Sequence, residues 1–226
     1  MIRLAIFDCD GTLVDSGASI YAALKASLEE HGRPVPPPRE ARRVVGLSLF
    51  QAMAMLVPDA DPDDVEAMAE TYRQAFHRLR LMGQVEEPLF EGITELIDAL
   101  SRDGWLLAVA TGKSDRGLRH CLDSHGLQGR FVSLQTADRH PSKPHPAMAL
   151  AAMAEAGSEP ANTVFIGDTG WDMGCARAAA VGAIGVGWGY HDEAELLAEG
   201  AHAVALQPSD VLTLASQWQG GRFGRG

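Results

Sequence analysis

The sequence predicts a doubly wound α/β fold, with a mostly parallel, Rossmann-like sheet as its core and an all-helical segment inserted into it. Two patterns lead to this prediction. Short apolar runs alternate with helical patterns along most of the chain, whereas the stretch 15–87 contains helical patterns without an intervening strand. Strands that alternate with helices of this length imply right-handed β-α-β crossovers, and therefore a parallel sheet.

The first expected strand is the apolar run 4–7, which is bounded by charged residues, as is typical of a strand buried on both faces. Similar runs recur downstream, and the segments between them carry apolar residues at helical spacing. The other expected strands are 106–110, 164–166 and 183–186, with 131–134 as a fifth, and the expected helices of the core are 94–100, 114–125, 147–156 and 173–180.

The inserted segment has its clearest helix after Asp61, a residue that can cap a helix, and Pro62, which is favoured at the first helical position. Further helices are expected at about 20–30 and from about Glu40, because the prolines of 34–38 cannot continue a helix. We expect the apolar stripe of the clearest helix to pack in a core. The stripe consists of Val65, Met68, Ala69, Tyr72, Phe76 and Leu79.

These patterns divide the chain into an α/β core, residues 1–14 and 88–226, and a helical cap, residues 15–87. The glycine-rich end 220–226 is expected to be a frayed tail, since it offers little apolar surface to offset the entropy lost on ordering.

The composition is that of an ordinary globular protein, with 46% hydrophobic and 22% charged residues. Its formal net charge of −11 disfavours nucleic-acid and anionic membrane partners, which an acidic surface repels. No apolar run approaches the ~18 residues of a membrane span. Cys9, Cys121 and Cys175 lie far apart, as expected of reduced thiols rather than of a zinc site. We therefore expect a soluble, cytoplasmic protein without nucleic-acid or membrane partners; no pattern indicates its oligomeric state.

Polar residues gather at the carboxyl ends of four expected strands, which is where open α/β sheets bind ligands. The four segments are 8–15, 111–113, 142–144 and 167–172. Taken singly, an aspartate after a strand often only caps the next helix, and a lone lysine is usually a solvated surface charge. Four such segments at four strand ends favour a functional site.

Strand alternation places the side chains of Asp8 and Asp10 on one side of the backbone and Cys9 on the other, within the packing. Gly11 allows the backbone to turn there, so that N–H groups can face an anion. Carboxylates that share a small site repel unless a cation lies among them or one holds a proton. With Asp168 from another strand end, these hard oxygen ligands suit Mg²⁺, which commonly bridges to a phosphate.

Three more residues complete the expected site. Asp172, one helical turn after Asp168, offers a fourth carboxylate. Thr111 and Lys143 offer a hydroxyl and a positive charge to phosphoryl oxygens. The sequence thus predicts phosphate chemistry at a magnesium site.

These motifs strongly resemble those of the haloacid dehalogenase superfamily of phosphohydrolases. The four motifs of that family match the segment 8–15, Thr111, Lys143 and the segment 167–172. The helical cap of the family is inserted after the first motif, as at about Asp15 here. The resemblance covers nearly the whole chain.

The resemblance implies a role for each motif residue. Asp8 would be the nucleophile that forms an aspartyl-phosphate. Asp10 would be the general acid that protonates the leaving oxygen and later the base that activates water, while its backbone carbonyl binds Mg²⁺. Asp168 would bind Mg²⁺ directly, and Asp172 through water or from the second shell. The implied phosphate-binding residues are Thr111, Gly112 and Lys143, and the implied metal residues are Asp8, Asp10, Asp168 and Asp172.

In the cap, Arg42, Arg43 and Gly46 occupy the region where similar proteins have a substrate-facing loop. Arginine suits a substrate carboxylate or a second phosphate, and a solvated helix face is the alternative interpretation. Lys113, which closely follows Thr111, is ambiguous in the same way.

Within the superfamily, the chain looks most like the phosphoglycolate phosphatase group, and the run 142–146 is similar to that group's. The founding dehalogenases lack the acid found here at Asp10, which argues against dehalogenation. The implied activity is Mg²⁺-dependent hydrolysis of a small phosphate monoester resembling 2-phosphoglycolate. Three alternatives stay open: a sugar-phosphate mutase of the β-phosphoglucomutase type, an inorganic pyrophosphatase, and a non-catalytic regulator that binds a metabolite.

Overall fold

A computed structural model describes residues 1–219 and 222–223 of the chain. Of the glycine-rich end, for which a frayed tail is expected, only residues 222–223 are described. They form strand β8 (Arg222–Phe223), which pairs in antiparallel fashion with β7 (Trp218–Gln219).

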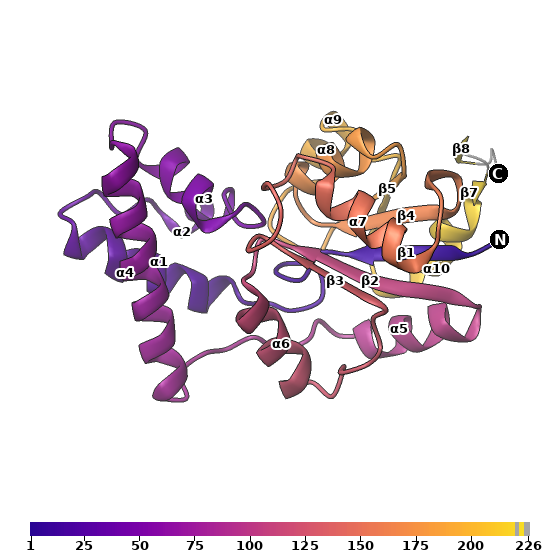
Figure 1. Cartoon of the computed structure of the whole chain (residues 1–226), viewed down its shortest axis with the longest axis horizontal. Helices are drawn as coiled ribbons and strands as arrows, with labels where there is room; N and C mark the ends of the chain where they lie inside the picture. The colour runs from indigo at the N-terminus through magenta and orange to yellow at the C-terminus, as the bar shows by residue number, and fades with distance from the viewer. Residues whose placement is uncertain (220–221, 224–226) are drawn as a thin grey trace.

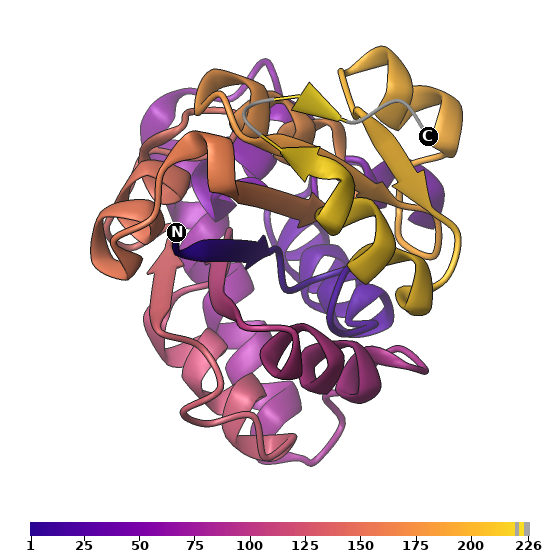
Figure 2. The same cartoon turned by 90° about the vertical axis from the view of Figure 1, so that its right-hand side faces the viewer.

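The core is a parallel sheet with helices on both faces, which confirms the predicted doubly wound α/β class (Figures 1 and 2). Within the described residues the sheet has six strands in the order β3-β2-β1-β4-β5-β6. The order reverses between β1 and β4, which is where such sheets form a ligand crevice. The strands are β1 (Arg3–Phe7), β2 (Trp105–Thr111), β3 (Ser133–Thr136), β4 (Thr163–Gly167), β5 (Gly182–Val186) and β6 (Ala203–Ala205).

The helices fall into two groups. One group packs along the sheet. The other comes between β1 and α5 in the sequence and lies to one side of the sheet (Figure 1). The first group is α5 (Ile93–Arg102), α6 (Asp115–Ser124), α7 (Ala147–Ala156), the 3₁₀ turn η1 (Pro160–Asn162), α8 (Gly170–Ala178), α9 (Glu193–Ala198) and α10 (Pro208–Gln217). The second group, called the helical group below, is α1 (Gly17–Glu30), α2 (Pro38–Arg42), α3 (Leu49–Leu56) and α4 (Pro62–Leu81).

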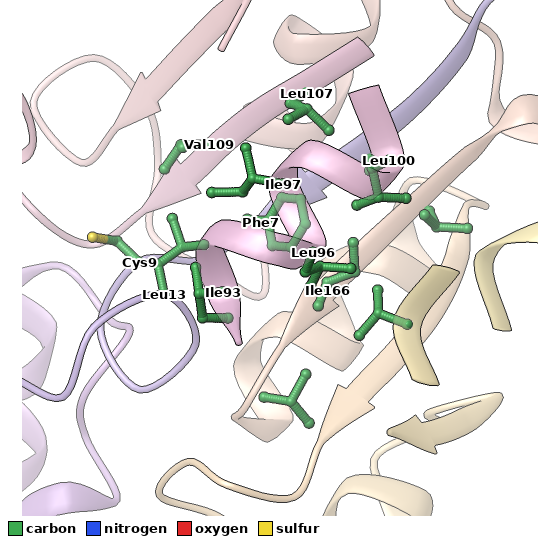
Figure 3. Packing of buried hydrophobic residues seen from close by; sticks show 14 of the residues in the cluster. Phe7, Cys9, Leu13, Ile93, Leu96, Ile97, Leu100, Leu107, Val109 and Ile166 are labelled. Atoms are coloured by element: carbon green, nitrogen blue, oxygen red, sulfur yellow. The ribbon is translucent and has the colours of Figure 1, made fainter. Parts of the chain in front are cut away.

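Buried apolar side chains cover both faces of the sheet. On one face, Phe7 of β1 packs with Ile97 of α5 and Ile166 of β4 in a single cluster (Figure 3). Cys9 belongs to the same cluster, so it lies within the packing as expected, and its Sγ lies 3.8 Å from that of Cys121. The described cysteines are all free thiols. A rigid sheet buried on both faces holds its strand ends in fixed positions.

The sequence prediction differs from the structure mainly at short or polar elements. Strand β3 begins two residues later than the expected 131–134 and includes Gln135, whose buried amide is satisfied by the Ser133 hydroxyl at 2.7 Å. Strand β6 and helices α3, α9 and α10 were not predicted. Strand β6 has only three residues, too few to show a pattern.

The helical group has a core of its own. Val65, Met68 and Ala69 of the α4 stripe are buried there against α1, as expected. The side chain of Asp61 accepts a hydrogen bond from the backbone N–H of Asp64 at 2.9 Å, which explains why α4 begins at Pro62. Phe76 of the same stripe instead lines a cavity toward the sheet.

The two connections between the helical group and the sheet run side by side. Val14 forms an isolated antiparallel bridge with Leu89, and the Asp15 N–H donates to the carbonyl of Pro88 at 2.8 Å. This pairing supports a division of the chain at these points, and cap boundaries at 15 and 87 remain our proposal. In the described part of the chain, none of the helices combines the length and apolar character needed to cross a membrane.

Candidate active site

Three buried carboxylates meet at the switch point of the sheet. Asp8 directly follows β1, Asp168 directly follows β4, and Asp172 lies in the first turn of α8. One oxygen from each lies within 4.8 Å of the others, and all three residues are fully buried. Because β1 and β4 are parallel neighbours, their carboxyl ends share one edge of the sheet, which brings these side chains together.

Hydrogen bonds from nearby hydroxyl and N–H groups hold two of these carboxylates. Asp172 forms a capping box with Thr169, whose hydroxyl donates to Asp172 Oδ2 at 2.7 Å. Asp168 accepts hydrogen bonds from the Thr12 hydroxyl at 2.9 Å and from the Tyr190 N–H at 3.0 Å. Gly11 has a φ of +83°, and a Cβ there would lie 2.1 Å from Asp168 Oδ2. Glycine is therefore required where the first motif turns past Asp168.

Lys143 is the positive charge of this cluster. Its Nζ lies 2.6 Å from Asp172 Oδ1 and 3.1 Å from Asp8 Oδ2, and the side chain is fully buried. Burial lowers the pKa of Lys143, but the neighbouring Asp172 and Asp8 carboxylates outweigh burial and hold it above its ordinary value. Three carboxylates against one ammonium group leave an excess of two negative charges.

This excess charge makes the cluster suitable for a divalent cation. Burial, followed by the charges of Asp172 and Asp10, raises the pKa of Asp8 to about 7 although Lys143 opposes the shift. Burial and the same crowding hold the pKa of Asp168 well above its usual range. Among the described residues, Asp8 Oδ2 has no partner besides the Lys143 ammonium group. A buried oxygen with room for a further partner, among hard oxygen donors, fits Mg²⁺.

Asp10 has different neighbours. Its Oδ1 accepts a hydrogen bond from the Ser16 hydroxyl and lies 2.8 Å from Lys113 Nζ, and its carboxylate is outside the group of three. Lys113 Nζ also lies 2.6 Å from Glu87 Oε1. The expectation that Asp8 and Asp10 extend one strand fails because β1 ends at Phe7 and the chain then turns. Lys113 is thus a buried partner of Asp10 rather than a solvated charge.

Strand β2 ends at Thr111 beside this site, and Gly112 follows it. Thr111 is buried, and its hydroxyl accepts the Lys113 N–H at 3.3 Å. A Cβ on Gly112 would lie 2.3 Å from the Leu47 carbonyl oxygen and 2.8 Å from that of Gly46. The loop of the helical group therefore touches the end of β2.

Comparison with known proteins decides the family. A sequence model described as haloacid dehalogenase-like hydrolase matches residues 5–186. The chain belongs to the haloacid dehalogenase-like hydrolases. This confirms the family that the motifs predict.

This haloacid dehalogenase-like hydrolase is similar to proteins named as phosphatases and to solved hydrolase structures. The chain is 35% identical over 217 residues to the "Probable phosphatase IndB" of Dickeya dadantii, which covers 95% of this chain and 94% of that protein. It is 31% identical over 189 residues to the phosphoglycolate phosphatase of Xylella fastidiosa, with 83% and 81% covered. A solved hydrolase structure from Pseudomonas syringae has a TM-score of 0.83 at 27% identity, covering 96% of this chain and 99% of that one.

In this hydrolase, the cap residues singled out from the sequence lie at different places. Gly46 faces the carboxylate cluster, and a Cβ there would lie 3.6 Å from Asp8 Oδ2. Arg43 forms an ion pair with Glu195 of α9 at 2.7 Å. The Arg42 guanidinium lies over the Tyr190 ring, 5.8 Å from its centroid. Of the three, Gly46 alone reaches the cluster among the described contacts.

Other contacts join the helical group of the hydrolase to its core. The Trp171 indole donates to the Arg43 carbonyl at 3.0 Å, and the Ser48 N–H donates to the Ser142 hydroxyl at 2.7 Å. Sequence reasoning did not predict these contacts, because each bond joins segments far apart in the chain and has no local pattern. Together they hold the loop that follows α2 closed over the site.

Proposed function

We propose that this hydrolase is a Mg²⁺-dependent phosphatase that cleaves a phosphate monoester through an aspartyl-phosphate on Asp8. One observation carries the proposal: the fully buried Asp8 carboxylate has an oxygen whose single partner among the described residues is the Lys143 ammonium group, 3.1 Å away. Such an oxygen is available to attack phosphorus, and the ammonium group draws an anionic phosphate toward it.

The neighbouring residues supply the remaining roles. In this proposal Asp10 donates a proton to the leaving oxygen and later removes one from the attacking water. The Ser16 hydroxyl and the Lys113 ammonium group hold its carboxylate in place. Lys143, Thr111 and the backbone at Gly112 hold the transferring phosphoryl group. Asp8, Asp168 and the backbone carbonyl of Asp10 would hold Mg²⁺, with Asp172 assisting through water, and the bound ion would neutralise part of the charge of the phosphate.

The substrate in this proposal is a small, soluble phosphate ester, and the helical group selects it as a cap. The name of the Xylella relative makes 2-phosphoglycolate the first compound to test. The purified protein is incubated with 2-phosphoglycolate, p-nitrophenyl phosphate, pyrophosphate, or β-glucose 1-phosphate with a trace of the 1,6-bisphosphate, with and without Mg²⁺. We expect Mg²⁺-dependent phosphate release from a monoester. Faster formation of glucose 6-phosphate than of phosphate would indicate a mutase, preference for pyrophosphate a pyrophosphatase, and no turnover of any compound a regulator.

Mg²⁺ is expected to stabilise the protein more at about pH 8 than at about pH 5. The pKa of Asp8 rises from 3.8 to about 7 in the metal-free fold, so the folded state holds more protons than the unfolded state between these values. The stability of the metal-free protein therefore falls as pH rises through that window. Saturating Mg²⁺ offsets the loss by about 2–3 kcal/mol, or roughly 5–10 °C in Tm. Differential scanning calorimetry in EDTA or Mg²⁺ measures both shifts, and equal shifts at the two pH values would contradict the metal site.

Gly112→Ala is expected to lower kcat/KM by about tenfold or more, because its methyl group would push the 46–47 carbonyls away from β2 at a cost of roughly 1–3 kcal/mol. Gly187→Ala is the matched control, since Gly187 does not line the cavity beside Asp10 and a Cβ there would meet the flexible end of Leu206 at 3.3 Å and the Ala205 carbonyl oxygen at 3.6 Å. Steady-state kinetics on one substrate compares the two variants. Unchanged kinetics for Gly112→Ala would show that the closed loop is not the active arrangement.

A further inference from the structure

A cavity of about 520 Å³ lies between the helical group and the sheet and reaches Asp10. One side of the cavity is formed by α1, α4 and residues 44–50, which include the start of α3. The other side is formed mainly by residues 112–117. Pockets of roughly 300–1,000 Å³ usually hold drug-sized ligands. Glycolate, the alcohol released from 2-phosphoglycolate, has the volume of only a few water molecules, each of which takes up about 30 Å³. The cavity is therefore much larger than that leaving group needs.

The wall formed by the helical group is apolar and aromatic. Ile20 and Leu24 of α1 line it beside Tyr72 and Phe76 of α4. The two rings are stacked with centroids 6.0 Å apart and an angle of 29° between their planes. Both are only partly buried, so ring surface is open to the cavity. Surfaces of this kind bind planar or apolar parts of ligands.

Hydrogen-bond donors lie on the same wall. Arg80 Nε is buried and has no hydrogen-bond partner among the described residues, although another guanidinium nitrogen lies 3.4 Å from Glu87 Oε2. The guanidinium carbon lies 5.2 Å from the centroid of the Phe76 ring. Burial and the Asp10 carboxylate raise the pKa of Tyr72, so its phenol stays protonated. The Arg80 side chain is 19% exposed and lines the cavity, so its guanidinium group offers hydrogen-bond donors to a ligand there.

The residues expected to bind a substrate carboxylate do not line this cavity. Arg42 lies over Tyr190 and Arg43 pairs with Glu195. Lys113 does line it, but its ammonium group is already between the carboxylates of Asp10 and Glu87. Beside the ring surface, the cavity thus offers guanidinium groups, which include those of Arg80 and Arg116, and no free lysine among the described residues.

We propose that this cavity holds the leaving group of the substrate, and that the substrate is a phosphate monoester of a ring-bearing alcohol with an oxygen acceptor for the Arg80 guanidinium group. The ring lies against Tyr72 and Phe76, and the phosphate lies at Asp8. This proposal rests on the proposed phosphatase function and narrows its substrate class from glycolate-sized esters to larger, unsaturated ones.

The test compares kcat/KM among defined esters with Mg²⁺ present. Uridine 5′-monophosphate and pyridoxal 5′-phosphate carry unsaturated rings with oxygen acceptors, whereas 2-phosphoglycolate has no ring. We expect at least one ring ester to exceed 2-phosphoglycolate by about tenfold or more. A higher kcat/KM for 2-phosphoglycolate than for both would overturn the substrate class and leave the phosphatase function standing. No Mg²⁺-dependent phosphate release from any ester, p-nitrophenyl phosphate included, would instead overturn the phosphatase function itself.

A variant tests the role of the Arg80 guanidinium group. Arg80→Lys keeps a cation beside Glu87 but replaces the planar guanidinium donors by a single ammonium group. We expect it to reduce kcat/KM for the preferred ring ester about tenfold more than for 2-phosphoglycolate. Arg78→Lys is the matched control, because Arg78 is exposed on the same helix and does not line the cavity. An equal loss on both substrates would mean that Arg80 acts only on the fold, and would overturn its assignment to the leaving group.

Discussion

Asp8→Asn is expected to reduce kcat at least ~10³-fold while the protein stays folded. An amide cannot form the acyl-phosphate, and every later step depends on that bond. The substitution removes one of three crowded carboxylates, so the metal-free variant should be no less stable than the parent at neutral pH. Phosphate release gives the rate, and circular dichroism with a thermal melt checks the fold.

Asp123→Asn is the matched control for this prediction. Asp123 is exposed near the end of α6, far along the chain from the motif residues, and its substitution should leave kcat unchanged. Trapping of a phosphorylated protein with ³²P-labelled substrate adds a direct readout. Label should be incorporated into the parent and not into Asp8→Asn; a labelled Asp8→Asn variant would place the phosphoryl group elsewhere.

Lys143→Met is expected to destabilise the protein by about 3–5 kcal/mol, because it leaves buried carboxylates without their cationic partner. For a chain of this size the loss corresponds to roughly 10 °C in Tm. Turnover should also fall at least ~10²-fold, since the phosphate loses its buried positive charge. Urea unfolding gives the free energy, and steady-state kinetics gives the rate.

The origin of this effect can be tested by adding back positive charge. Mg²⁺ or mild acid should recover part of the lost stability of Lys143→Met, since either one reduces the negative charge of the cluster. Lys25→Met is the control: Lys25 is exposed and lies 3.7 Å from Glu29, so its loss should cost less than about 1 kcal/mol. Equal losses in the two lysine variants would contradict the charge argument.

The sheet and the main cluster could be predicted because both follow from local pattern. Buried parallel strands appear as short apolar runs, and their carboxyl ends meet at one edge, so Asp8 and Asp168 were expected together. The turn at Gly11 and the cap at Asp172 are also local. The strand β6 lacked such a pattern because three small residues at a sheet edge resemble a loop.

Contacts between the helical group and the core could not be predicted in the same way. Glu87 meets Lys113, and Arg43 meets Glu195, only because of how α4 and the loop after α2 lie on the core. Neither pair has a spacing that a sequence pattern would reveal. The aromatic wall of the cavity is a similar case. Helical spacing grouped Phe76 with core residues, and only the packing shows that its side chain lines a cavity.

The paired connections at Val14–Leu89 and Asp15–Pro88 have a consequence for how the chain could have been assembled. Since the two ends of the inserted segment already lie side by side, the sheet needs no help from that segment to bring β1 and α5 together. The loop-closure entropy for the sheet grows only slowly with the length of whatever lies between these points. An insert of another length or fold could therefore replace α1 to α4 at little cost to the catalytic sheet, so that specificity can change while the reaction centre is kept.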